Sequence, residues 1–133
     1  MNKSIDYFFN NVSPKAIEAL DHLEFSETGT KRLCLHESIE SDLHVMLIKM
    51  ANNNKFSYHK HMHSDEFVIL IDGDLRYTFE DDSIHHLSKN DKCSLIIPRG
   101  KSHSVSSGKK GALFIEVIRG PFKKENTKFA ENL

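Results

Sequence analysis

A succession of short apolar segments separated by turn residues runs from residue 32 to residue 118. The segments cover residues 32–36, 43–50, 66–71, 75–80, 84–87, 94–97, 104–107 and 112–118. Many short strands at close spacing, with little helix, predict an all-β sandwich or small barrel. An Asp-Gly pair at 72–73 predicts a hairpin at 72–74, and the glycine-flanked stretch 107–111 predicts a second break.

One short helix is expected before the strands. Ser13 is a good cap residue, and Pro14 suits the first helical position. Ile17, Leu20 and Leu23 follow at a three-residue spacing, which predicts a short amphipathic helix.

The composition is that of a single globular domain. The chain has 133 residues, of which 38% are hydrophobic and 28% charged, so it can bury a core of its own. We divide it into an N-terminal segment with the helix at 1–30, a barrel at 31–122 and a C-terminal tail at 123–133.

Charge and cysteine usage limit the partners and the compartment. The net charge is −1 and there is no basic stripe, which argues against a nucleic-acid partner. The first residues hold no apolar run long enough for a signal peptide or membrane span, so no membrane partner is expected. Cys34 and Cys93 form neither a CxxC pair nor a disulfide framework, which predicts a reducing, cytoplasmic location.

Three of the nine histidines alternate along one short stretch. His59, His61 and His63 would share one face of a strand, and neutral imidazole is the commonest metal ligand in proteins. Glu66 heads the next apolar run, where a buried carboxylate needs a partner that a metal cation would supply. Asp65 is a rival for this carboxylate role.

A further imidazole comes from His103, which follows an apolar segment, a proline turn and a glycine. With His59, His61 and Glu66 it makes a set of three histidines and one carboxylate, suited to Fe(II), Mn(II), Ni(II) or Zn(II). The alternative is a group of polar side chains on a half-exposed sheet. His63 is better explained as a histidine near the mouth of the site than as a ligand.

Two stretches resemble the two cupin motifs. "HKH", followed by Glu66 and then Gly73, is similar to the first motif, and "PRG", followed by His103, is similar to the second. This resemblance implies that His59, His61, Glu66 and His103 hold the metal. The chain departs from the motifs at Asn53, Lys92 and Ser107, which stand where two glycines and an asparagine are expected and put only turn details in doubt.

A wider resemblance covers residues 13–130. "RLCLHES", "HVMLIKM", "YHKHMHSDEFVILIDGDL" and the end from "FIEVIRGPF" to "TKFA" are similar to the WbuC-type small cupin metalloproteins, which accompany O-antigen and other surface-polysaccharide genes. The resemblance implies a cupin double-stranded β-helix with a short N-terminal helix and one divalent metal. It also implies a homodimer and a sugar or sugar-nucleotide substrate, but no settled reaction.

Five further residues are candidates for catalysis or substrate binding near the metal. Glu116 lies in the apolar run "ALFIEVI" and could act as a general base, orient a ligand histidine, or pair with a cation as a structural group. Arg32 and His36 share a strand face, and Arg32 could bind a substrate phosphate or form a rim salt bridge. His63 and Tyr77 could contact substrate, although core packing is the favoured role of Tyr77.

Three functions remain open. The first is isomerisation or epimerisation of a keto-sugar intermediate, with the metal as Lewis acid and Glu116 or a histidine moving a proton. An Fe(II)-dependent dioxygenase would need the same ligands and an open position for O₂. A non-catalytic cupin that senses or binds a small molecule is the third.

Overall fold

The computed structural model describes residues 12–129, so residues 1–11 of the expected N-terminal segment lie outside the described part. One α-helix, one 3₁₀ helix and eight strands form in the order α2 (Pro14–Asp21), β1 (Thr30–Cys34), β2 (Leu43–Met50), β3 (Lys55–His61), β4 (Glu66–Phe79), β5 (Ile84–Ser88), β6 (Ser94–Ile97), β7 (His103–Arg119), η1 (Lys124–Asn126) and β8 (Thr127–Phe129). The protein is therefore mostly β, as the segment pattern predicts. No helix among these elements is long and apolar enough to cross a membrane.

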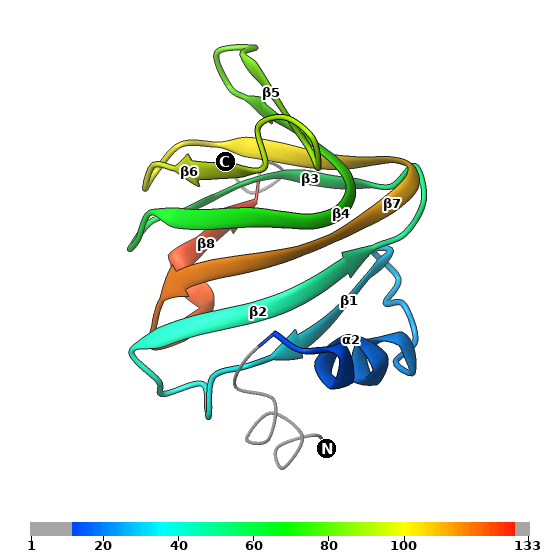
Figure 1. The fold of residues 1–133 in the computed structure, drawn as a ribbon. Coiled ribbons are helices and arrows are strands. Elements are labelled where there is room, and N and C mark those ends of the chain that lie inside the picture. Colours follow the sequence, from blue (N-terminus) through cyan, green and yellow to red (C-terminus); the bar gives the residue numbers. More distant parts are fainter. Residues whose placement is uncertain (1–11, 130–133) are drawn as a thin grey trace.

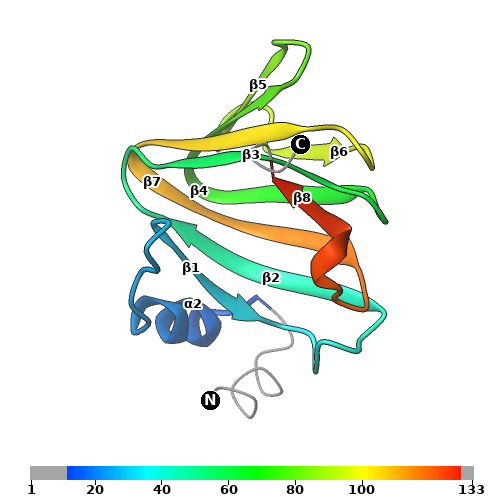
Figure 2. The ribbon, with the colours of Figure 1, turned by 180° about the vertical axis from the view of Figure 1, so that it is seen from behind.

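All strands belong to one antiparallel sheet. The order β1-β2-β7-β3-β8 forms one path, and β4 pairs with β7 while also carrying β5 and β6. Figure 1 shows that β4 and β7 both curve strongly, so the sheet curls over itself into a half-barrel. Seen from behind, β8 lies beside β3 at the edge of the curl (Figure 2).

The predicted helix is confirmed, and it covers the outer face of the sheet beside β1 and β2 (Figure 1). The Ser13 hydroxyl accepts a hydrogen bond from the Ala16 amide at 3.2 Å, as a capping serine does. Ala16 and Leu20 are fully buried against apolar residues of the two strands. The helix ends at Asp21, so Leu23 lies beyond it and is exposed.

The two predicted breaks at 72–74 and 107–111 are wrong, because β4 and β7 are each one long strand that bends. β4 pairs with β7 on both sides of Gly73, with register shifts around that residue. Gly73 has φ +80°, and a Cβ there would collide with the backbone carbonyl oxygen of Gly111. A glycine is therefore required at position 73 because the two paired strands lie very close together there, and it does not form a hairpin turn.

This bend determines where the ends of the β4–β7 ladder lie. Glu66 opens β4 opposite Ile118 near the end of β7, and His103 opens β7 opposite Phe79 at the end of β4. The two opening residues thus belong to opposite ends of one ladder. The curl brings them back together, with Glu66 Oε1 3.6 Å from His103 Nε2.

The inner face of the curl carries the main apolar core, and one part of it remains open. Val68, Leu75, Phe79, Leu87 and Phe114 are buried there, among others. Since side chains alternate along a strand, the inward residues of β1, β2, β3 and β7 also line the open part.

Candidate metal centre

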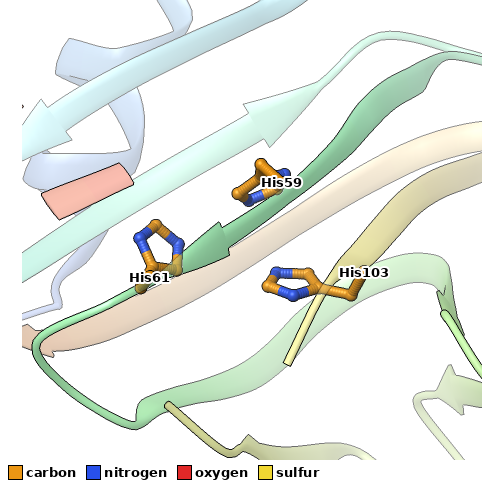
Figure 3. A group of neighbouring side chains, drawn as sticks. All are labelled: His59, His61 and His103. Carbon is orange, nitrogen blue, oxygen red and sulfur yellow. The ribbon is translucent and has the colours of Figure 1, made fainter. Parts of the chain in front are cut away.

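Three histidines from two neighbouring strands converge inside the curl (Figure 3). His59 and His61 lie on the same face of β3, and His103, the first residue of β7, pairs directly with His59. One ring nitrogen from each lies within 4.8 Å of those of the other two. His59 and His103 are buried and His61 is partly buried, so His61 is the most exposed of the three rings.

Hydrogen bonds determine which nitrogen of two rings carries the proton. The Nδ1 atom of His59 lies 2.9 Å from the Ser57 carbonyl oxygen, and that of His103 lies 2.9 Å from the Lys101 carbonyl oxygen. A carbonyl oxygen can only accept, so Nδ1 donates in both rings. The Nε2 atoms keep their lone pairs, which is the form that binds a metal.

Glu66 completes the group from the other side of the curl. Its side chain is 2% exposed, and Oε1 lies 3.7 Å from His61 Nε2 and 3.6 Å from His103 Nε2. Within residues 12–129, His61 Nε2 has no hydrogen-bond partner, and Glu66 is offered a side-chain hydrogen bond only by the neighbouring Glu116 carboxyl. Buried polar atoms are costly when incompletely paired, and a divalent cation between Glu66 and the imidazole nitrogens would pair them. The residues present therefore fit a metal ion.

The charge states agree with this arrangement. Burial lowers the pKa of His61 to about 3, and it lowers the pKa values of His59 and His103 as well, so all three rings are neutral at pH 7. Burial raises the pKa of Glu66 to about 7. A cation binding there would displace the remaining carboxyl proton, because metal ligands must be deprotonated.

A cavity of about 470 Å³ opens beside the cluster, and His59 and His61 form part of its wall. Most of the wall is apolar and includes Met46, Ile48, Met50, Phe56, Phe114 and Phe129. Four of the predicted substrate or catalytic residues also line it: Arg32, His36, His63 and Glu116.

Glu116 is half-buried on the inward face of β7. Burial, followed by the nearby Glu66 carboxyl, raises the pKa of Glu116 to about 8. It makes no salt bridge with any residue of the described chain, so the structural pairing considered from the sequence is not formed there. Burial and the neighbouring Glu66 carboxyl thus favour the protonated form of Glu116 at the wall of the cavity.

Arg32 projects from β1 into the same cavity and is exposed there. Among residues 12–129 it has no ion-pair partner, so the predicted rim salt bridge is absent from this part of the chain. Its charge lowers the pKa values of both Glu66 and Glu116 against the larger effect of burial. A free guanidinium beside a carboxyl pair is suited to bind an anionic group.

The two candidate histidines outside the cluster also line the cavity. His36 accepts a hydrogen bond from the Val45 amide on Nδ1 at 3.1 Å, and its ring stacks on His44 with centroids 3.9 Å apart. His63 donates from Nε2 to the Arg119 carbonyl oxygen at 2.7 Å. His63 is not one of the three clustered histidines.

Tyr77 is not placed where it could contact a substrate in the cavity. Its side chain is 1% exposed, lies in the core and does not line the cavity. The reason is that Leu75, Tyr77 and Phe79 alternate inward on β4, which places the Tyr77 ring 6.2 Å from the His103 ring. Asp65 is an exposed loop residue that accepts a hydrogen bond from the Arg99 amide.

The sequence gives no signal for several residues at the site. Thr127, Lys123, Lys124 and Phe129 line the cavity from the C-terminal end of the described chain, and His44 lines its mouth. Residues 123–128 are all polar, so no alternation predicts β8, and its pairing with β3 is a long-range contact.

The sequence matches no protein-family model and no curated protein, but solved structures resemble it. Oxalate decarboxylase from Bacillus subtilis is 22% identical, with a TM-score of 0.65 over 84% of this chain and 31% of the decarboxylase. KdgF from Halomonas sp. is 19% identical, with a TM-score of 0.63 over 79% of this chain and 91% of KdgF. A conserved Klebsiella pneumoniae protein with a double-stranded β-helix domain is 20% identical, with a TM-score of 0.65 over 84% and 87% of the two chains.

The chain has the cupin fold. At these identities the likeness concerns the fold alone, and this chain spans about a third of the length of the decarboxylase. One structure of that decarboxylase is described by its Mn(II) centres. In the present chain, the cluster of three histidines is a group that could hold a divalent metal.

Proposed function

We propose that this cupin binds one divalent transition metal through His59, His61, Glu66 and His103. We further propose that it acts on a sugar or sugar-nucleotide intermediate of surface-polysaccharide biosynthesis, in an isomerisation or epimerisation. The observation that carries the metal site is the convergence of three buried or half-buried imidazoles on the buried Glu66 carboxyl, whose Oε1 lies within 3.7 Å of two imidazole nitrogens. The resemblance to WbuC-type cupins supports the substrate.

The metal, when bound, would supply a Lewis acid for a carbonyl or hydroxyl of the substrate. The chain supplies the other parts. Glu116 holds a proton on the cavity wall and can pass it to or take it from a neighbouring carbon or oxygen. Arg32, without an ion-pair partner in the described chain, would bind a phosphate or carboxylate of the substrate.

Metal content is the first property to measure. We expect protein purified without chelator to contain iron, manganese, nickel or zinc at close to one equivalent by elemental analysis. The His59→Ala/His61→Ala double variant should lose this metal, because two of the four ligands are gone. His63→Ala is the matched control and should keep it, since His63 is not part of the cluster. Wild-type protein that neither contains nor takes up metal would contradict the proposal.

Activity then separates the three functions. The Mn(II) centres of the decarboxylase support manganese as the first metal for reconstitution. Turnover of a keto-sugar nucleotide by the loaded wild type, lost in Glu116→Gln, would support the isomerase. Oxygen uptake with a substrate would favour the Fe(II) dioxygenase instead. Tight binding of a sugar nucleotide without turnover would favour the sensing or binding role.

We also propose a homodimer. Phe67 on β4 and Ile96 on β6 are direct neighbours across the sheet, and they are 38% and 64% exposed. Adjacent exposed apolar side chains on one sheet face are a common feature of interfaces. A second copy of the chain is the partner that the resemblance to cupins favours.

A further inference from the structure

His61 differs from the other two clustered histidines in what holds its ring. His59 and His103 each donate from Nδ1 to a carbonyl oxygen two residues earlier in the chain, so their orientation is set locally. The Nδ1 atom of His61 instead lies 3.2 Å from the Thr127 hydroxyl oxygen, across a sequence separation of 66 residues. The ring of His61 thus depends on the C-terminal strand β8.

A hydroxyl partner allows either ring nitrogen of His61 to carry the proton, whereas a carbonyl partner requires the proton to be on Nδ1. A carbonyl oxygen accepts only, whereas a threonine hydroxyl can accept or donate. When the Thr127 hydroxyl accepts from Nδ1, the lone pair on His61 Nε2 faces Glu66 and the ring can bind a cation. When the hydroxyl donates, Nδ1 has no proton, Nε2 carries one, and the ring cannot bind a cation there.

The contacts of β8 place it firmly against the ligand strand. His59 pairs with Phe129 and His61 with Thr127 in the β3–β8 register, and the Met62 amide donates to the Asn126 carbonyl oxygen at 2.7 Å. The Phe129 ring lies 5.8 Å from the His59 ring, centroid to centroid. β3 is the only strand with which β8 pairs in the described sheet.

We propose that Thr127 is a positioning residue for His61 and that it couples the docking of β8 to metal binding. This inference rests on the proposed metal site. A cation that requires the Nδ1–H form of His61 selects the state in which Thr127 accepts, and by linkage it stabilises β8 on β3. Docked β8 in turn raises the affinity for the cation by the same factor.

The first test is metal affinity, measured with Mn²⁺ and Zn²⁺ against a chromophoric chelator. Thr127→Val keeps the shape of the side chain and removes the hydroxyl, and we expect roughly 10- to 100-fold weaker binding. Thr127→Ser restores the hydroxyl and should return affinity to near the wild-type value. Thr28→Val, whose hydroxyl contacts only Ser26 and Thr30, is the control and should leave affinity unchanged.

The second test reads the coupling directly. Hydrogen exchange of the amides in 127–129 should slow when metal is added to wild type or Thr127→Ser, and should change much less in Thr127→Val. Nitrogen-15 NMR of the imidazoles should assign the Nδ1–H form to His61 in the Zn²⁺-loaded wild type. Equal unfolding midpoints for the metal-free wild type and Thr127→Val would exclude a general loss of fold.

The outcomes separate this inference from the metal site itself. Wild type that binds metal, together with Thr127→Val that binds equally well, overturns the role of Thr127 and leaves the site intact. Equal loss in Thr127→Val and Thr127→Ser also overturns it, because the hydroxyl would not be the active feature. Wild type that binds no metal overturns the proposed function and this inference together.

Discussion

The burial of the Glu66 carboxyl indicates what kind of site this residue belongs to. An ionised carboxyl that is 2% exposed, with the Glu116 carboxyl as its nearest hydrogen-bonding group, is costly in a protein that uses it only for structure. Its Oε1 atom faces two imidazole nitrogens whose rings are neutral at pH 7. A positive charge between them would stabilise the ionised form of Glu66.

The stability of the metal-free protein should reflect this cost. Burial raises the pKa of Glu66 to about 7 and that of Glu116 to about 8, from 4.5 for the free side chain. Above about pH 7.5 the clustered histidines are neutral in the folded chain and nearly neutral in the unfolded chain, where the histidine pKa is about 6.5, so these carboxyls determine the slope. The unfolded chain has released protons that the folded chain keeps, so the free energy of unfolding should fall as pH rises from about 7.5 to 8.5. The fall is about 1.4 kcal/mol per pH unit for each carboxyl still protonated.

Urea unfolding with chelator present, followed across that pH range, measures this fall. Glu66→Gln and Glu116→Gln should each flatten it, because a glutamine has no proton to release. Below about pH 7 the clustered histidines act in the opposite direction, because their lowered pKa values make the unfolded chain bind more protons than the folded chain as pH falls. A wild-type stability that is constant or rises between about pH 7.5 and 8.5 would contradict the assignment.

At this scale, the sequence predicts residues whose signal is local. The alternation of His59 and His61 places both on one strand face, and this holds in the structure. His103 was found through a turn pattern combined with the cupin resemblance. Thr127 could not be found, because it reaches His61 through pairing between segments 66 residues apart. Nothing in a single sequence reports such pairing.

Among the elements, the long strands β4 and β7 determine the shape. Asp-Gly is a strong local signal for a hairpin, yet β4 continues through it because β7 offers hydrogen-bond partners on both sides of the bend. Strand existence was therefore predictable from alternation, whereas the joining of two segments into one strand was not. The strand ranges 43–50 and 94–97 match β2 and β6, which are bounded by clear turns on both sides.

Gly73→Ala should measure the importance of the bend. The new Cβ would meet the Gly111 carbonyl oxygen, and the residue would also be held at φ +80°. Gly100→Ala is a matched control, since Gly100 has φ +78° but nothing within 4 Å of an added Cβ. We expect Gly100→Ala to cost about 1–3 kcal/mol from backbone strain alone and Gly73→Ala to cost clearly more. Chemical denaturation of both variants measures the loss in the free energy of unfolding. Equal losses would show that the close approach of the two strands at Gly73 is unimportant.

For the molecule as a whole, the proposed homodimer can be tested on its outer face. Ile96→Lys adds a charge to the exposed apolar pair that Ile96 forms with Phe67 on β6 and β4. We expect wild type to have the mass of a dimer in light scattering coupled to size exclusion, and the variant to be monomeric at the same concentration. Lys92→Ala, a surface change elsewhere, is the control. A monomeric wild type would contradict the proposal.

The curl of the β4–β7 ladder has a mechanical consequence for the cluster. Glu66 and His103 begin the two strands at opposite ends of that ladder, and the bend at Gly73 brings the two ends of the ladder close to each other. A small change in the bend angle becomes a larger displacement at the ends of the ladder, where Glu66 and His103 lie. For the proposed metal site, metal affinity should therefore change with sheet curvature, and a ligand in the cavity should alter that affinity without contacting any of the four proposed metal-binding residues.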